Sequence, residues 1–244
     1  MENNFIYGRN SVLEALLSGK REINKILLSQ TARGDAVSKI IKLARQKGIV
    51  LQNCPPKKLD KLSANSQGIA AEISPAKYED IENLIEAAKK KTNSFLAVLD
   101  SIEDPHNLGA IIRNCAAFGA VGVVIPKRHS ASVNETVSKT SAGAIEHIDI
   151  ARVSNINQTI ELLKENGFWI YGLDRSGKDI SGADFVFPTA IVVGGEGNGL
   201  HRLTKEKCDF LISIPQSDSI SSLNASCASA VALYEISKRA LSLV

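Results

Sequence analysis

The chain has few of the residues that mark secreted, membrane-spanning or metal-binding proteins. Four of its 244 residues are cysteine, and none stands in a C-x-x-C or Cys/His spacing, which argues against a disulfide framework and against a metal site. No apolar run approaches the roughly 18 residues that a membrane helix needs. The opening MENNFIYGRN lacks the basic-then-apolar pattern of a secretion signal. We therefore expect a cytoplasmic protein with reduced thiols, no membrane association and no metal.

Charge is nearly balanced over the whole chain but not along it. The formal net charge is +3, yet residues 1–75 carry 12 Lys and Arg against 6 Asp and Glu, a net of +6, while the remainder carries 17 against 20, a net of −3. A basic segment of this kind predicts contact with a polyanion such as RNA, because neutralising phosphates supplies affinity. A solvated basic surface without a partner would give the same asymmetry.

The N-terminal part predicts a small α/β domain over residues 1–75. Ser11-x-x-Glu14 has the spacing of a capping box at the start of a helix, and a second helix is expected over residues 35–47. Strands are expected at residues 25–29, 49–52 and 68–73. The charged stretch at 76–94 follows as a linker, partly helical around 81–90.

From residue 95 onward, strand-like and helix-like segments alternate. This order predicts an α/β domain at 95–244, with a mostly parallel sheet covered by helices on both faces. The expected strands are 95–99, 121–125, 148–153, 168–173, 191–194 and 211–214.

Three segments of this second domain carry polar residues at places where ligands bind. The first is DSIEDPHNLGAIIRNCAAFG, in which Asn107 and Arg113 lie around a helix start just beyond the carboxyl end of a strand. Open α/β sheets bind ligands at that edge. Taken singly, Asn107 could be an N-cap and Arg113 an exposed helical cation.

The second segment is IVVGGEGNGL, residues 191–200, where a strand runs into four glycines with Glu196 among them. Glycine is favoured where a ligand must touch the backbone, although an ordinary glycine turn has the same composition. The third is IPQSDSISSLNASCASAVALYE, residues 214–235, in which a polar loop ends at Ser222 and Asn224 and small residues open a helix. This could equally be a capped, closely packed core helix.

Together, in this order and spacing, the three segments resemble the SpoU (TrmH-type) family of RNA ribose 2′-O-methyltransferases, within the SPOUT superfamily. The matching motifs are Asn107-x₅-Arg113, then Gly195-Glu196-Gly197-x-Gly199, then Ile214-Pro215 with Ser222-Leu223-Asn224. Asp218 departs from the pattern, because the family usually has Gly there. FIYGRNSVLEALLSG and SQGIAAEI, near the N-terminus, are similar to the substrate-binding domain of the RlmB-like branch.

The resemblance implies a C-terminal trefoil knot, S-adenosylmethionine as cofactor and a homodimer formed through the knotted domain. It also implies methyl transfer to RNA, with a guanosine of large-subunit ribosomal RNA as the expected target and tRNA as the alternative. The residues that it assigns to catalysis are Arg113, Asn107, Glu196, Ser222 and Asn224. Those that it places at the cofactor's adenosine, mainly through their backbones, are Gly194, Gly195, Ile214 and Leu223.

The role of Arg113 needs a separate physical argument. The family's proposal is that this arginine helps to deprotonate the 2′-OH, but a guanidinium has a pKa above about 12 and is a poor base. A charged Arg113 could instead hold the phosphate beside the target ribose and stabilise a developing alkoxide. We predict that Arg113 is essential in either case.

Two other classes of function compete with this hypothesis. One is an RNA-binding protein of the same fold with little catalysis, active in ribosome assembly or drug resistance. The other is a nucleotide hydrolase, because residues 172–178, GLDRSGK, match most of a P-loop. Asp179 stands where the Mg²⁺-binding Ser or Thr would be, which argues against the hydrolase.

Overall fold

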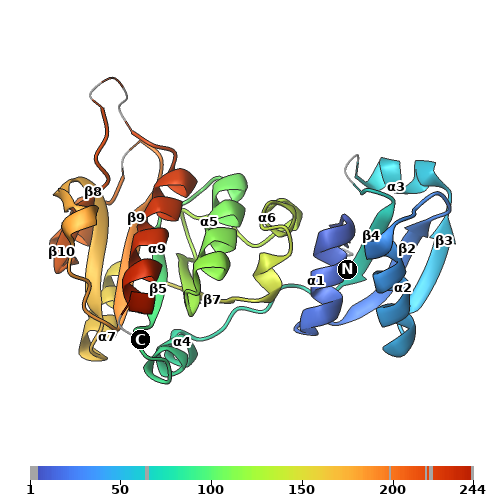
Figure 1. Cartoon of the computed structure of the whole chain (residues 1–244), viewed down its shortest axis with the longest axis horizontal. Coiled ribbons are helices and arrows are strands. Elements are labelled where there is room, and N and C mark those ends of the chain that lie inside the picture. The colour runs from blue at the N-terminus through green and yellow to red at the C-terminus, as the bar shows by residue number, and fades with distance from the viewer. Residues whose placement is uncertain (1–4, 64–65, 198, 218, 220–221, 243–244) are drawn as a thin grey trace. The chain divides into compact units, whose positions relative to one another are not determined.

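The structure is a computed structural model that describes residues 5–242 apart from 64–65, 198, 218 and 220–221. Its contacts divide the chain into two compact units. The first unit consists of residues up to 77 together with 133–147, and the second of residues 78–132 together with those from 148 onward (Figure 1). Asp218, the departure from the family pattern, lies outside the described residues.

The first unit is a small α/β domain with one four-stranded sheet, in agreement with the predicted class. Its sheet has the strand order β1-β4-β2-β3, in which only β2 and β3 are parallel. Val12, Leu16, Ile26 and Ile40 are fully buried between the sheet and the helices. Its elements are β1 (Phe5–Tyr7), α1 (Arg9–Ser18), β2 (Ile23–Ser29), α2 (Asp35–Gln46), β3 (Val50–Cys54), α3 (Pro56–Leu62), β4 (Ile69–Ile73), α6 (Glu135–Thr140) and the 3₁₀ helix η1 (Ala144–Glu146).

Two details of this unit differ from the predictions. Helix α1 begins at Arg9 after an N-cap Gly8 that makes no side-chain cap, so the predicted capping box at Ser11 is wrong. The segment 133–147 packs against α1 and β1, and the ion pair between Arg21 and Glu146 lies within this unit. Sequence periodicity carries no sign of this packing.

The second unit contains the predicted parallel sheet. Its strand order is β10-β8-β9-β5-β6-β7, and every neighbouring pair is parallel. All six strands expected from the sequence are present. They are β5 (Phe95–Asp100), β6 (Gly122–Pro126), β7 (Asp149–Val153), β8 (Trp169–Asp179), β9 (Thr189–Gly194) and β10 (Phe210–Ser213).

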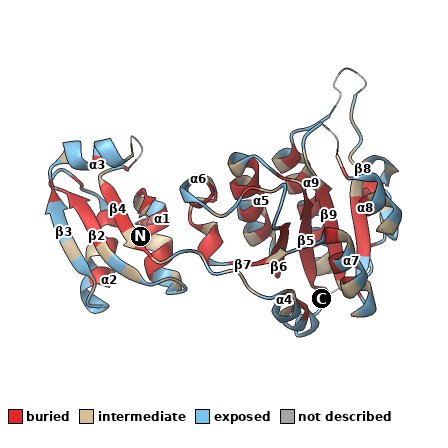
Figure 2. Cartoon of the chain, turned by 180° about the vertical axis from the view of Figure 1, so that it is seen from behind, coloured by how far each residue is buried: buried red, intermediate tan, exposed pale blue. Residues whose placement is uncertain are grey.

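Helices cover both faces of this sheet. Helices α5 and α9 pack side by side on one face, and α7 and α8 pack together against the other (Figures 1 and 2). Helix α5 follows β5 on the way to β6, and α7 follows β7 on the way to β8, on the other side of β5 in the sheet. The helices are α4 (Ile81–Lys89), α5 (Pro105–Phe118), α7 (Ile156–Glu165), α8 (Arg202–Lys207), α9 (Ala225–Ser242) and the 3₁₀ helix η2 (Ile180–Gly182).

The central strands β5 and β9 end together at the carboxyl edge of the sheet. Asp100 pairs with Gly194 at the last position of their register. Both strands are buried along almost their whole length (Figure 2). The strands that follow β5 are added first on one side of it, as β6 and β7, and then on the other side, as β8, β9 and β10. This change makes the carboxyl edge at β5 a topological switch point, where ligands bind in open sheets. The trefoil knot implied by the resemblance stays a prediction.

The segment that matches a P-loop is part of strand β8. A Cβ on Gly172 would lie 2.7 Å from Cys208 Sγ, and one on Gly177 would lie 2.4 Å from the backbone nitrogen of Ile212. Gly177 is therefore required by the close approach of the β8 backbone to that of β10, whereas Gly172 makes room for neighbouring side chains. Between them the pairing of β8 with β10 jumps from Gly172 to Lys178, and only the short 3₁₀ helix η2 follows, where a P-loop opens an α-helix. With Asp179 in place of the Mg²⁺-binding Ser or Thr, the structure argues against a P-loop.

Candidate active site

Three polar side chains, one from each predicted motif, meet at the carboxyl edge of the sheet. Asn107 Nδ2 donates to Glu196 Oε1 at 2.9 Å, and Asn224 Nδ2 donates to Asn107 Oδ1 at 2.9 Å. Asn224 Nδ2 also donates to Glu196 Oε1, which closes the triangle. Asn107 is buried, while Glu196 and Asn224 are exposed. The residues are 28 to 117 positions apart in sequence, so only the fold brings them together.

Asn107 takes its place in the first turn of α5. The helix is capped by Asp104, whose side chain accepts from the backbone N–H of His106, and Pro105 occupies the first helical position. Asn107 is therefore not the N-cap, and its amide is free to point away from the helix start. Both the nitrogen and the oxygen of this buried amide have a hydrogen-bond partner, as buried polar groups in native proteins usually do.

The glycine loop after β9 is shaped by close backbone contacts. A Cβ on Gly194 would lie 2.2 Å from the carbonyl carbon of Gly199, and one on Gly195 would lie 2.3 Å from Ser101 O. No other residue fits either position without moving backbone. The loop closes with a bond from Gly199 N to Gly195 O at 3.1 Å. These glycines hold Glu196 against Asn107.

A buried carboxylate that the sequence reasoning missed anchors the same loop. Asp100, the last residue of β5, accepts from His201 N at 3.0 Å through Oδ2, and its Oδ1 lies 2.9 Å from His201 Nδ1. The bond to the backbone fixes the end of the loop just before α8 begins. An Asp at the end of a buried strand was the available signal, but its partner could not be read from spacing.

Helix α9 begins at the site and is capped by one of its residues. Asn224 Oδ1 accepts from the backbone N–H of Ser226 at 2.9 Å and of Cys227 at 3.3 Å. The side chain therefore does two things at once, because its oxygen caps α9 while its nitrogen bonds Asn107 and Glu196. Ser222, the other predicted polar residue of this segment, is exposed and does not act as the cap.

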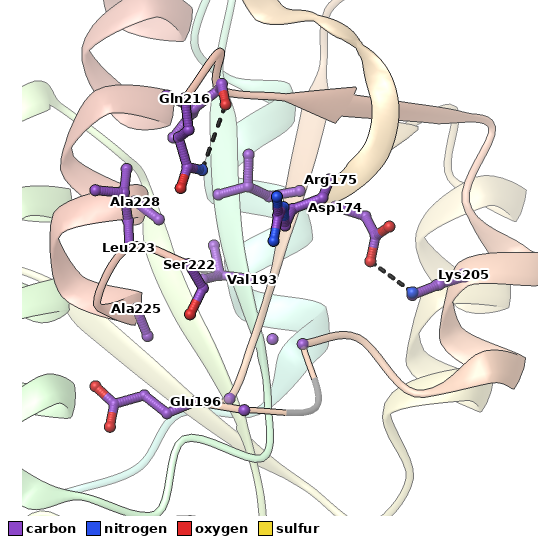
Figure 3. A pocket seen from close by; sticks show the side chains of 16 residues that line it. Asp174, Arg175, Val193, Glu196, Lys205, Gln216, Ser222, Leu223, Ala225 and Ala228 are labelled. Carbon is purple, nitrogen blue, oxygen red and sulfur yellow. Dashed lines mark hydrogen bonds and ion pairs between the residues drawn. The ribbon is translucent and has the colours of Figure 1, made fainter. Parts of the chain in front are cut away.

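A cavity of about 500 Å³ opens beside this triangle (Figure 3). Gly194, Gly195, Glu196, Ile214, Ser222 and Leu223, all predicted from the sequence, line it. The remaining lining residues include Leu173, Asp174, Arg175, Val193, Lys205, Gln216, Ala225 and Ala228.

The polar wall formed by Asp174 and Lys205 was not predicted. Lys205 Nζ lies 2.6 Å from Asp174 Oδ2 (Figure 3). Partial burial alone would raise the pKa of Asp174, but hydrogen bonds from Lys205 and Ser176 outweigh that effect and hold the pKa below its ordinary value. The carboxylate is therefore charged at neutral pH and neutralises the adjacent Lys205.

A second cavity of about 380 Å³ shares Gly195, Glu196 and Gly199 with the first. Asn107 lines this one, together with Ser101, Ile102, Glu103, Asp104, His129 and His201. The hydrogen-bonded triangle thus lies where the two cavities adjoin. Such an arrangement suits the transfer of a group between two ligands, one in each cavity.

Among the residues predicted from the sequence, Arg113 alone belongs neither to the triangle nor to the lining of either cavity. It is exposed on the middle of α5 and lines neither cavity. Six residues along a helix place it about 120° around the axis from Asn107. The neighbouring Asn114 faces α9 instead, donating to Ser226 O at 3.1 Å.

The described residues contain no group of three or more His, Cys, Asp or Glu side chains placed to hold a metal. Within the same part of the chain, no helix has the length and apolar character to cross a membrane.

The fold and the two cavities define an α/β enzyme that holds small groups over a glycine loop at the edge of a parallel sheet. Comparison with known families gives its identity. The SpoU rRNA Methylase family matches residues 94–234, and the family described as "RNA 2'-O ribose methyltransferase substrate binding" matches residues 5–79. The chain belongs to the SpoU rRNA Methylase family. It is an RNA methyltransferase, which confirms the predicted family and enzyme class.

Relatives and solved structures agree with this assignment. A Bacillus subtilis (strain 168) protein named "Putative TrmH family tRNA/rRNA methyltransferase YacO" is 42% identical over 98% of this chain and 96% of its own length. A Staphylococcus saprophyticus protein named "Putative TrmH family tRNA/rRNA methyltransferase" is 44% identical over 98% and 97%. The fold matches that of the SpoU methyltransferase AviRb from Streptomyces viridochromogenes, crystallised with AdoMet, with a TM-score of 0.82 at 23% identity over 98% of this chain and 90% of that one.

Proposed function

We propose that the protein transfers the methyl group of S-adenosylmethionine to a ribose 2′-OH in RNA, and that its target is a guanosine of large-subunit ribosomal RNA. The alternative target is a tRNA ribose. The observation that carries the proposal is the triangle of Asn107, Glu196 and Asn224 at the junction of two cavities. The preference for ribosomal RNA rests on the N-terminal resemblance to the RlmB-like branch. The relatives' names include both RNA classes.

The first cavity suits S-adenosylmethionine in its shape and in the groups that it offers. Its walls combine apolar side chains with exposed loop backbone at the glycines, as a flat base and a ribose require. One buried acceptor in the wall, Gln216 Oε1, has no donor among the described residues. We assign cofactor binding to the backbones of Gly194, Gly195, Ile214 and Leu223. The cofactor supplies an electrophilic methyl group on a positively charged sulfur.

The second cavity is our candidate site for the target nucleotide. Glu196 lines both cavities and Asn107 lines the second, so together they can hold the ribose hydroxyl in line with the incoming methyl group. Transfer would break the bond between sulfur and the methyl group as the new O–C bond forms, and the hydroxyl proton would have to leave. We assign its acceptance to Glu196 Oε2, because both hydrogen bonds of Glu196 within the triangle use Oε1. Ser222 at the edge of the first cavity is assigned a positioning role.

Arg113 lies outside both cavities of its own chain, so it can take part in the reaction only through bound RNA or a second copy of the protein. We propose that it binds an RNA phosphate beside the target ribose, and that the protein acts as a homodimer. Helix α9, which packs against α5, exposes Val231, Tyr234 and Leu241 on one face, since their spacings of three and seven residues return to the same side of a helix. We propose that a second copy covers this face.

The basic N-terminal unit is assigned the grip on RNA. Its match to a substrate-binding family supports this role, as does its net positive charge. Residues 1–75 and 95–244 remain our proposed substrate-binding and catalytic domains, joined by 76–94. A cytoplasmic location stays a prediction.

The decisive experiment maps 2′-O-methylation across ribosomal RNA and tRNA from cells with and without the gene. The purified protein should then restore the missing mark on RNA from the deletion strain, with tritiated S-adenosylmethionine as donor. A mark lost from a large-subunit rRNA guanosine supports the full proposal, and a mark lost only from tRNA selects the alternative. If calorimetry detects RNA binding but no cofactor binding, the protein is an RNA-binding member of the fold and the proposal is wrong.

A further inference from the structure

Gln216 lies in the wall of the first cavity, and its side-chain oxygen makes no hydrogen bond with the described residues. Its Nε2 donates to Ile214 O at 3.4 Å, close to the end of β10. Its Oε1 is buried and has no donor among the described residues. Figure 3 shows the carboxamide directed into the cavity from the side opposite Glu196.

The orientation of this amide follows from its surroundings. Exchanging the nitrogen and the oxygen would place Oε1 against the carbonyl oxygen of Ile214, so that two acceptors would face each other. The observed orientation therefore leaves the oxygen as the group that needs a partner. Buried acceptors in native proteins are nearly always satisfied, and an unsatisfied one in a cavity wall indicates a donor on the ligand.

The side chains around Gln216 indicate which ligand group can donate a hydrogen bond to Oε1. Ile214, whose carbonyl accepts from Gln216, is apolar, as are Leu223 and Ala228, whereas the carboxylates Asp174 and Glu196 lie elsewhere on the wall (Figure 3). A cationic ammonium group is stabilised best by a carboxylate, and a neutral acceptor between apolar side chains suits the N–H of a planar base. The exocyclic amino group is the donor that an adenine base carries.

We infer that Gln216 reads the adenine of the cofactor, with Oε1 accepting a hydrogen bond from the exocyclic amino group. This inference rests on the proposed function, since it assumes that S-adenosylmethionine occupies the first cavity. A 6-oxo purine presents an oxygen at the same position, so two acceptors would meet and binding would weaken. Gln216 thereby determines which base the cavity accepts.

The test is calorimetry of the full chain with two ligands, S-adenosylhomocysteine and its 6-oxo analogue S-inosylhomocysteine. Four proteins are compared, namely the wild type, Gln216→Leu, Gln216→Glu and the neighbouring control Ser217→Ala. Leu removes the acceptor at similar volume. Glu keeps an acceptor oxygen in either protonation state. Ser217 is exposed and lines neither cavity.

The wild type should bind S-adenosylhomocysteine more tightly than the 6-oxo analogue. Gln216→Leu should weaken binding of S-adenosylhomocysteine by about tenfold, as expected for one well-placed hydrogen bond. Its affinity for the 6-oxo analogue should stay the same or rise, because the opposed acceptor is gone. Gln216→Glu should keep the preference for the amino purine, and Ser217→Ala should match the wild type with both ligands.

Three outcomes would overturn the inference. Unchanged affinity of Gln216→Leu for S-adenosylhomocysteine would show that Oε1 has no ligand donor. An equal loss with both ligands would assign it to a group that they share, such as a ribose hydroxyl. Failure of the wild type itself to bind S-adenosylhomocysteine would instead overturn the proposed function, and this inference with it. If Gln216→Leu does not fold, Gln216→Met replaces it in the same comparison.

Discussion

Asn224 allows the structural and the functional contribution of one side chain to be separated. Its Oδ1 caps helix α9, and its Nδ2 holds Asn107 and Glu196. Asn224→Ala removes both functions. Asn224→Ser keeps the first, because serine caps helices about as well as asparagine, but its hydroxyl is too short to replace the amide nitrogen in the triangle.

The expected losses of stability follow from these contacts. Removing the cap costs about 1 kcal/mol. Leaving Asn107 Oδ1 without its donor costs about 1 kcal/mol more, at the low end for a buried acceptor because water can enter from the adjoining cavity. Asn224→Ala should therefore lose about 2 kcal/mol, a Tm decrease of roughly 4–8 °C, and Asn224→Ser about half of that.

Turnover should not follow stability. Both variants lose the amide that orients Asn107 and Glu196, so both should fall by about 100-fold in methyl transfer, as misplaced catalytic groups do. The matched control is Asn114→Ala, which removes a bond between the same two helices, to Ser226 O, away from both cavities. It should lose stability and keep its turnover. Wild-type turnover in Asn224→Ser, measured with tritiated cofactor, would refute the role of the triangle in the reaction.

Three further predictions concern other parts of the chain. Arg113→Ala should abolish methyl transfer, since the proposed contact with an RNA phosphate is lost. Tm and cofactor binding should stay unchanged, because the side chain is exposed in its own chain and lies outside both cavities. Activity close to that of the wild type would contradict the assignment. Helix α3 exposes Lys57, Lys58 and Lys61. Replacing all three by alanine should reduce the slope of log K for RNA binding against log salt concentration by up to about three units. An unchanged slope would show that RNA does not contact these lysines. Thiol reagents should modify Cys227 first at pH 8, because this cysteine is exposed, whereas burial raises the pKa of Cys208 to about 12. Mass spectrometry of the labelled peptides checks this order.

The fold of the second unit could be predicted because its central strands, β5, β6 and β9, are nearly continuous apolar runs, which is typical of strands buried on both faces. The limits of several elements could not. Strand β8 extends to Asp179, well past the predicted end at 173, because the chain pairs with β10 again after a shift of register, where Gly177 allows the two backbones to approach. The packing of 133–147 with the first unit depends on contacts such as that between Arg21 and Glu146, 125 residues apart. Local pattern carries no information about pairs at such separations.

The candidate site divides in the same way. Asn107, Glu196 and Asn224 could be named from three motifs, and the structure joins them by hydrogen bonds. The position of Arg113 on another face of α5 was available from helical geometry alone, since six residues are not a whole number of turns. Asp100 and Lys205 escaped prediction because each acts through a partner that only the folded chain reveals.

The site also bears on whether this chain catalyses a reaction or only binds RNA. Asn107 is a buried amide on a helix face that is otherwise apolar, and it is tolerable only because two other loops satisfy it. An apolar residue there would need no such partners, since a buried polar network seldom stabilises a protein more than a well-packed apolar core. The small Ala225 and Ala228 likewise leave the first cavity open, where larger side chains would fill it and add stability. At Asn107 and at the two alanines, the chain is therefore less stable than other residues would make it, and both places lie at the same edge of the sheet. This is the expected cost of a site that must hold a cofactor and orient a reacting group, and a protein that only grips RNA through its basic unit has no use for either feature.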